Sequence, residues 1–127
     1  MYSISKTFSF EAAHHLPSLP PEHKCSRVHG HSYTVTVTVA GSDLHGPGWV
    51  MDFAGLNPLG DYLARVVDHR DLNEVLDFEP TSERLARYLH DWCTAGIRLP
   101  AGARVESVRV SEKASSTFVE YRPGAAS

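Results

Sequence analysis

The chain has 127 residues, which suits one domain, because a chain of this length buries about two thirds of its unfolded surface in a single core. Its formal charge of −3, with Lys and Arg scattered rather than clustered, argues against nucleic acid or an anionic membrane as a partner. No basic segment leads into a long apolar run, so we expect no secretory signal, no membrane helix and a cytoplasmic location. We predict a single domain over residues 1–122 and a C-terminal tail at 123–127.

Alternating apolar and polar residues predict four β-strands. The pattern is clear in residues 2–11 and clearest in residues 31–39, HSYTVTVTV. Residues 104–112 and 117–122 indicate two more strands, joined as a hairpin by the small polar loop KASS. A short extended piece, GWVMDF, falls between the two pairs of strands.

Two helices are predicted between the strand pairs. Asn57, followed by a proline, is typical of an N-cap, and the apolar stripe after it continues to about Asp68. The second helix begins at PTSE, where Thr81 or Ser82 can provide the cap, and it ends near Gly96. The predicted order is therefore ββααββ. A four-stranded antiparallel sheet with both helices on one face buries these stripes most simply, so the predicted class is α+β.

Three histidines are predicted to meet at one end of this sheet. Residues two apart in a strand point to the same side, about 6.6 Å apart, so His29 and His31 can converge on one ion. At the end of the first strand, His14 shares the parity of the phenylalanines, whereas His15 falls on the other side. Three neutral imidazoles suit Zn²⁺ and leave one coordination position open for chemistry. Ordinary surface histidines are the alternative interpretation.

Cys25 raises the further question of whether the metal site is open or closed. As a fourth ligand, this cysteine would complete a tetrahedral structural site. Its neighbours Lys24 and Arg27 instead favour a reactive thiolate, and residue chemistry alone leaves both readings open. In a reducing compartment Cys25 should be a free thiol, and Cys93 is most simply a small core residue. The remaining histidines are left out of the site because they lie in loops or on a solvated helix face: His23, His45 and His90.

Several motifs together carry a family resemblance. The chain resembles the 6-pyruvoyl tetrahydropterin synthase family over nearly its whole length through FEAAHHLP, CSRVHGHSY, MDF, DHRDLN, PTSE and a late SEK. Within that family, the Cys-x3-His-Gly-His spacing is most like the bacterial 6-carboxy-5,6,7,8-tetrahydropterin synthases of queuosine (7-deazaguanine) biosynthesis. Animal-type synthases place the cysteine farther away, and a folate-pathway group has glutamate there.

The resemblance implies roles for individual residues. It implies zinc on His14, His29 and His31, with Cys25 as the catalytic base. It also implies a proton-transfer pair of Asp68 and His69. Adjacent residues on a regular helix do not face each other, so this pair requires an irregular helix end, and Asp71 remains a possible substitute for Asp68.

The resemblance further implies that Glu112 anchors the pterin, since one carboxylate can accept two parallel hydrogen bonds from a pterin edge. The hydroxyls and backbone N–H groups at Thr81 and Ser82 are expected to contact the same edge, although this segment is first a helix cap. The basic residues nearest the site in sequence, and therefore candidates for holding the triphosphate, are Lys24, Arg27 and Arg70.

The implied enzyme is a zinc-dependent carbon–carbon lyase that converts 7,8-dihydroneopterin triphosphate to 6-carboxy-5,6,7,8-tetrahydropterin, acetaldehyde and triphosphate. No redox cofactor is expected, in agreement with the absence of a GxGxxG or GxxxxGK[ST] pattern. The resemblance also implies the tunnelling fold (T-fold), in which three sheets form a barrel and two such rings form a homohexamer. The alternatives are a 6-pyruvoyl tetrahydropterin synthase and a noncatalytic zinc-binding module closed by Cys25.

Overall fold

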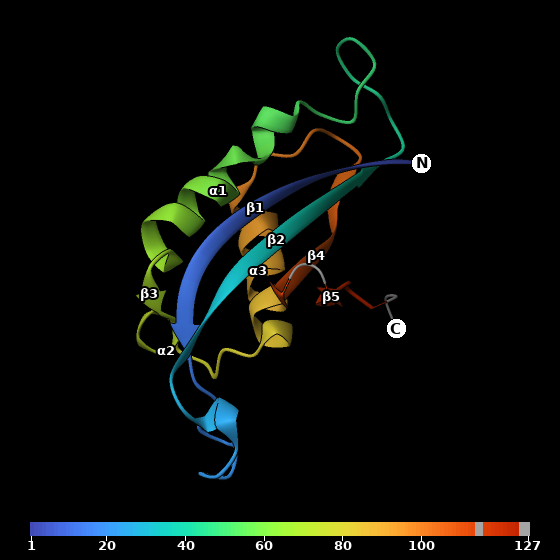
Figure 1. The fold of residues 1–127 in the computed structure, drawn as a ribbon. Coiled ribbons are helices and arrows are strands. Elements are labelled where there is room, and N and C mark those ends of the chain that lie inside the picture. Colours follow the sequence, from blue (N-terminus) through green and yellow to red (C-terminus); the bar gives the residue numbers. More distant parts are fainter. Residues whose placement is uncertain (114–115, 125–127) are drawn as a thin grey trace.

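A computed structural model describes residues 1–113 and 116–124 of the chain (Figure 1). One sheet has the strand order β3-β1-β2-β4-β5. Four neighbouring pairs join it: β1–β2, β2–β4 and β4–β5 are antiparallel, and β1–β3 is parallel. The strands are β1 (Tyr2–His14), β2 (His29–Gly41), β3 (Arg70–Asp71), β4 (Ala103–Lys113) and β5 (Thr117–Tyr121).

The helices cover one face of this sheet (Figure 1). A continuous helical segment follows β2 and consists of η2 (Phe53–Leu56), α1 (Asn57–Tyr62) and the π-helical η3 (Leu63–Val67). The short α2 (Leu72–Val75) follows β3, and α3 (Ser82–Gly96) precedes β4. A single turn, η1 (Lys24–Ser26), lies in the loop between β1 and β2.

The core lies between the sheet and the helices. The alternation of β2 places Val35, Val37 and Val39 on the helix side, where all three are fully buried. Each such side chain contributes about 1.5–3 kcal/mol relative to an exposed position. The helices supply fully buried leucines to the same core: Leu56, Leu59, Leu63, Leu85 and Leu89.

The predicted α+β class is confirmed, but the predicted four-stranded antiparallel sheet and the order ββααββ are wrong in detail. The sheet has five strands and is mixed, because β3 pairs in parallel with Ala12 and Ala13 of β1. A strand of two residues is too short to show an alternating pattern, so it could not be predicted from periodicity. It forms because His69, at φ +58°, turns the chain back along the edge of β1 immediately after the helix.

The start of the first helix also differs from the prediction. Asn57 is not the N-cap: α1 begins at this residue, and Leu56 precedes it without a side-chain capping bond. The Asn57 amide oxygen instead accepts a hydrogen bond from Lys6 Nζ at 2.5 Å. Asp52 provides a cap one turn earlier, because its carboxylate accepts from the N–H of Ala54. The helical segment ends at Val67, close to the predicted end at Asp68.

The second predicted helix is confirmed as α3, with one correction on its surface. Thr81 is the N-cap, since its Oγ1 accepts from the N–H of Arg84, and the helix ends at Gly96. His90 does not lie on a solvated face as predicted. It is buried, and its Nε2 lies 3.1 Å from the carbonyl oxygen of Val105, because the sheet reaches farther around α3 than periodicity indicates.

The predicted hairpin is confirmed as β4–β5, although residues 114–115 of its loop and 125–127 of the expected tail lie outside the described residues. The extended piece at residues 48–53 does not form a strand; His45 and Trp49 form an isolated bridge there. In the part of the chain that the structure describes, no helix is long and apolar enough to cross a membrane.

Candidate metal centre and substrate site

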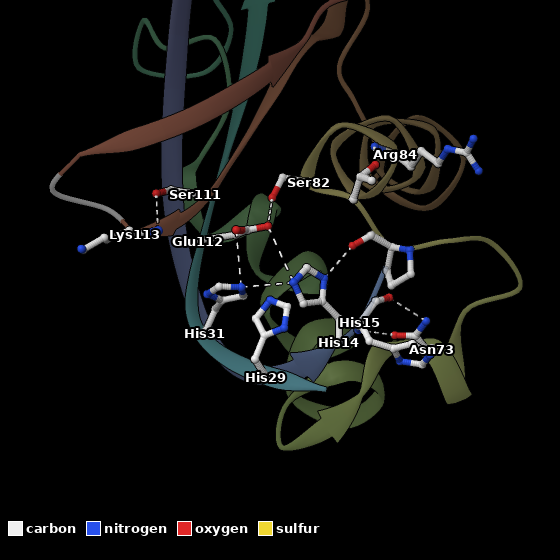
Figure 2. A network of polar contacts seen from close by, with 12 residues as sticks. His14, His15, His29, His31, Asn73, Ser82, Arg84, Ser111, Glu112 and Lys113 are labelled. Carbon is white, nitrogen blue, oxygen red and sulfur yellow. Dashed lines mark hydrogen bonds and ion pairs between the residues drawn. The ribbon is translucent and has the colours of Figure 1, made fainter. Parts of the chain in front are cut away.

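The three predicted histidines converge at one end of the β1–β2 pair (Figure 2). The antiparallel register sets His14 opposite His29, and Ala12 opposite His31, so all three histidines share the helix-facing side of the sheet. One ligand nitrogen from each lies within 4.8 Å of the others. We call His14, His29 and His31 the histidine triad. The parity argument that chose His14 over His15 therefore predicts the observed arrangement.

Backbone carbonyls orient two rings of the triad. His14 Nδ1 lies 2.8 Å from the carbonyl oxygen of Pro80, and His29 Nδ1 lies 2.7 Å from that of Arg27. Because a carbonyl can only accept, Nδ1 carries the hydrogen in both rings. In the neutral form, Nε2 of each ring then presents a lone pair, as metal-ligating histidines require.

The triad fits a cation with a preference for nitrogen ligands. His14 Nε2 and His31 Nε2 lie 3.1 Å apart, so two basic nitrogens face each other across the space that a metal would fill. Burial lowers the pKa of His31, and the neighbouring His14 and His29 lower it further against the opposing effect of Glu112. A lowered pKa favours the neutral imidazole, which is the ligating form. Three imidazoles in this arrangement suit Zn²⁺.

Cys25 does not belong to this ligand group. It lies in η1, in residues 16–28 of the connection between β1 and β2. We call residues 16–28 the cysteine loop. Among the described residues, the ligand group close enough to share one ion consists of the triad without Cys25. The thiol is free and partly exposed, as predicted for a reactive cysteine, and the arrangement leaves the metal site open.

Glu112 lies directly beside the triad (Figure 2). Its carboxylate oxygens lie 3.4 Å from His31 Nε2 and 3.9 Å from His14 Nε2, and one of them accepts a hydrogen bond from Ser82 Oγ at 2.7 Å. About a third of its side chain is exposed. A ring that hydrogen-bonds to this carboxylate would lie against the metal centre. Of the two predicted contact residues, Ser82 therefore reaches Glu112, whereas Thr81 is occupied as the helix cap.

The structure brings Asp68 and His69 together. Asp68 Oδ2 lies 3.0 Å from His69 Nδ1, and the positive φ of His69 provides the irregular helix end that the pair requires. Hydrogen bonds from the N–H of Glu11 and from His69 lower the pKa of Asp68, so it is ionised beside the imidazole at neutral pH. Asp71 is not the partner, because its side chain caps α2 through the N–H of Asn73.

Within one chain, His69 of this pair and His31 of the triad line the same hollow. The His69 side chain is 78% exposed, and the hollow has a volume of about 500 Å³. Residues of both parities from β1 and β2 contribute to its lining: Ala12 and His31 share the parity of the triad, and Glu11, Ala13, Gly30 and Ser32 have the opposite parity. Among residues 1–113 and 116–124, neither Asp68 nor His69 has a hydrogen bond or ion pair with a member of the triad.

Several groups that organise the site escaped the sequence analysis. The carbonyls of Arg27 and Pro80 orient the triad, and a backbone oxygen carries no residue-type signal. Tyr33 is fully buried, with its ring centroid 5.5 Å from that of His31 and 6.0 Å from that of His14. It was predicted only as a core residue of the second strand, but its aromatic ring also packs against the triad. The strict alternation of β2 could have placed it there.

Taken together, the fold and the site define an α+β protein with three histidines and a carboxylate at one end of a mixed sheet. A family model described as 6-pyruvoyl tetrahydropterin synthase matches residues 3–124, and the chain belongs to this family.

Named relatives agree with this assignment. The chain is 40% identical to a 6-carboxy-5,6,7,8-tetrahydropterin synthase from Synechocystis, covering 97% of this chain and 95% of the relative. It is 34% identical to a dihydroneopterin monophosphate aldolase from Pyrococcus furiosus, over 82% of this chain and 83% of that protein. The solved structure of Caenorhabditis elegans 6-pyruvoyl tetrahydropterin synthase is 26% identical, with a TM-score of 0.81 over 97% of this chain and 96% of that chain.

Proposed function

We propose that this protein is a zinc-dependent 6-carboxy-5,6,7,8-tetrahydropterin synthase of queuosine biosynthesis. It would convert 7,8-dihydroneopterin triphosphate and one water to 6-carboxy-5,6,7,8-tetrahydropterin, acetaldehyde and triphosphate. The observation that carries the proposal is the triad, with Glu112 only 3.4 Å from His31 and Cys25 outside the ligand group. The 40% identity to a synthase of this name, along nearly the full length of both chains, supports the same activity.

The site residues divide the chemistry among them. Glu112 would hold the amino and ring N–H groups of the pterin, with Ser82 fixing the carboxylate. Zinc on the triad would supply a Lewis acid that stabilises negative charge on the side-chain oxygens of the substrate. Cys25 would remove a carbon-bound proton, and His69, paired with Asp68, would return one. The side chain that is oxidised to the carboxyl group supplies the electrons that reduce the ring, so no redox cofactor is needed.

Three alternative functions, two of them enzymatic, would give different outcomes in an assay. A 6-pyruvoyl tetrahydropterin synthase uses the same substrate but keeps its carbon skeleton. An aldolase like the relative from Pyrococcus furiosus would consume dihydroneopterin monophosphate, the substrate in that protein's name. A noncatalytic zinc-binding module would turn over neither compound. Product analysis therefore distinguishes all of these from the proposed synthase.

We predict that the purified zinc-loaded protein releases acetaldehyde and triphosphate in equal amounts from 7,8-dihydroneopterin triphosphate, without an added redox cofactor. Acetaldehyde is measured with a coupled alcohol dehydrogenase, and the pterin is identified by mass. A product that retains three side-chain carbons would assign the pyruvoyl synthase instead. Preferential turnover of the monophosphate would assign the aldolase, and no turnover with bound zinc would favour the binding module.

We further propose that the active protein is a homohexamer of two stacked trimers. No strand of the described chain pairs with the outer edge of β1 along residues 2–10, and β5 forms the other edge of the sheet. Such edges must be paired or blunted, and joining them between chains would close a barrel. Among the described residues, the dyad of Asp68 and His69 has no hydrogen bond or ion pair with the triad, and this supports a site completed by a neighbouring subunit.

We predict that two inactive variants, Cys25→Ala and His69→Ala, regain activity when their subunits are mixed and allowed to exchange. If these residues reach one site from different chains, some mixed sites contain both native residues. Activity is measured before and after exchange, and each variant mixed with itself is the control. Proven exchange without recovered activity would place both residues in the same chain, and a monomer at micromolar concentration would contradict the assembly.

A further inference from the structure

The connection between α2 and α3 holds the cysteine loop through one carboxylate. Glu79 Oε1 accepts a hydrogen bond from the backbone N–H of Ser18 at 2.6 Å, and Glu79 Oε2 accepts one from Ser18 Oγ at 2.5 Å. Ser18 and Glu79 are 61 positions apart in sequence, so this bidentate contact fixes the loop to a distant element. Two charge-assisted hydrogen bonds with defined geometry are stronger and more directional than one.

Most other hydrogen bonds of the cysteine loop remain within it. Leu16 N–H donates to the carbonyl of Cys25, and the Cys25 N–H donates to His23 Nδ1. These contacts give the loop a compact shape but do not place it relative to the sheet. Among the described residues, the other hydrogen bond that leaves the loop joins the Arg27 carbonyl to His29, the first residue of β2. His15, the residue before the loop, exchanges two hydrogen bonds with Asn73 of α2. The Ser18–Glu79 contact therefore adds a fixed point within the loop itself.

The same connection also contacts the other parts of the site. One residue after Glu79, the carbonyl of Pro80 orients His14 of the triad. Two residues further on, Ser82 donates to Glu112. Residues 79–82 thus touch the cysteine loop, the triad and the carboxylate beside it. Fixing the loop to this segment therefore fixes Cys25 relative to the metal centre and to Glu112, the carboxylate proposed to bind the substrate.

From these contacts we infer that Glu79 is a positioning residue, which holds the cysteine loop in the conformation that presents Cys25 to the substrate. The inference rests on the proposed function in one respect, the role of Cys25 as the base. Proton transfer requires near-contact geometry, so a loop released by loss of Glu79 would still carry the thiol but would present it correctly only part of the time. The side chain of Glu79 itself has no hydrogen bond or ion pair with the triad or with Glu112 among the described residues.

The charge on Glu79 supports the contact. Hydrogen bonds from the hydroxyl and the backbone N–H of Ser18 lower the pKa of Glu79, so the carboxylate is ionised at neutral pH. Because its pKa is lowered in the folded state, the contact is complete above the ordinary pKa of a glutamate. It is lost as the pH falls through the lowered value. His15 and Arg84 also contribute favourable charge to this carboxylate.

The test compares Glu79→Ala and Glu79→Gln with the control Asp77→Asn in the full-length zinc-loaded protein. Asp77 lies on the same connection and is exposed, and no hydrogen bond of its side chain joins it to the described residues, so its variant makes a similar charge change without loss of a contact. Trypsin can cut the cysteine loop after Lys24 and Arg27. We expect cleavage at these two bonds to be about tenfold faster in Glu79→Ala, because proteolysis follows the population of the open loop.

Alkylation of Cys25 gives a second measure that does not depend on the reaction. Cys93 does not interfere, because it is fully buried and burial raises the pKa of its thiol to about 12. We expect faster alkylation of Cys25 in Glu79→Ala, an unchanged rate in Asp77→Asn, and an intermediate rate in Glu79→Gln. The glutamine keeps one acceptor oxygen, and this milder variant also covers the outcome in which Glu79→Ala fails to fold.

Turnover then separates positioning from a purely structural role. We expect Glu79→Ala to lower kcat about five- to tenfold with little change in KM, since Glu112 still holds the pterin. Ser18→Ala should lower kcat by less, and adding it to Glu79→Ala should lower kcat no further. If Glu79→Ala is cleaved and alkylated at the same rates as the native protein, the contact does not hold the loop in place. If its loop is loosened but its kcat is unchanged, Glu79 does not position Cys25. A native protein without turnover would instead contradict the proposed function.

Discussion

Replacing Cys25 with alanine is expected to abolish most turnover, about 10²–10⁴-fold in kcat, while the protein keeps its zinc. The physical reason is that general base catalysis contributes about this much, and alanine has no group that accepts a proton. The metal should remain because, among the described residues, the close ligand group consists of His14, His29 and His31 without the cysteine.

The measurement compares zinc content and turnover in the same Cys25→Ala preparation. Cys93→Ala is the matched control, because it removes the other thiol from a fully buried position on α3. That variant should be less stable by a modest amount but should retain turnover at temperatures where it is folded. If zinc content and activity fall together in Cys25→Ala, the cysteine is a ligand and the closed structural site is correct.

The open and closed sites also differ in what orients the ligands. In the structure, the carbonyls of Pro80 and Arg27 accept from the Nδ1 atoms of His14 and His29, so two of three ligands are aligned without Cys25. Cys25 itself lies on the cysteine loop, which one carboxylate and the start of β2 hold in place. A ligand of a structural zinc usually needs a firmer support than a base that must approach and leave its substrate.

The alternation of apolar and polar residues predicted the strands that bury one face against the core. The alternation in β1 and β2 places Phe10 and Tyr33 opposite each other and, four residue pairs further along on the same face, His14 opposite His29. A shift by one residue would send the valines of β2 to the solvent, so the register is strongly determined. The same constraint that fixes the core thus fixes the triad, and for this reason both could be predicted from the sequence.

Features that depend on a single bend or contact could not be predicted in this way. The strand β3 consists of two residues, and it exists because His69 adopts a positive φ after a π-helical turn. Asp71 was a possible substitute for Asp68 as the partner of His69, and the structure instead places it as the cap of α2. Nothing in the sequence around Glu79 indicates Ser18 as its partner, because a contact over 61 positions follows from the whole fold.

The lack of a direct contact between the dyad and the triad among the described residues bears on catalysis. A substrate held by Glu112 would lie against the triad, whereas His69 is highly exposed and borders a hollow whose lining includes one member of the triad, His31. The proposed hexamer predicts that the His69 that acts on this substrate comes from a second chain. The edges of the sheet at β1 and β5 offer the surfaces for such an assembly. An experiment on the oligomeric state and one on the acid–base chemistry would therefore test the same arrangement of chains around the site.

Loss of the triad is expected to have the largest effect, because it removes the metal on which the other roles depend. The double variant His29→Ala, His31→Ala should lose stoichiometric zinc and all measurable turnover. His14→Ala should weaken zinc binding by well over about 100-fold, since contacts that only orient a ligand are already worth about 10–100-fold. His15→Ala is the matched control, because His15 is adjacent to His14 but has the opposite strand parity and lies outside the ligand group. Metal content is measured after dialysis at neutral pH and again in mild acid, where protonation of the imidazoles should release zinc from the native protein. Stoichiometric zinc in the double variant, or equal losses in His14→Ala and His15→Ala, would show that the ion binds elsewhere.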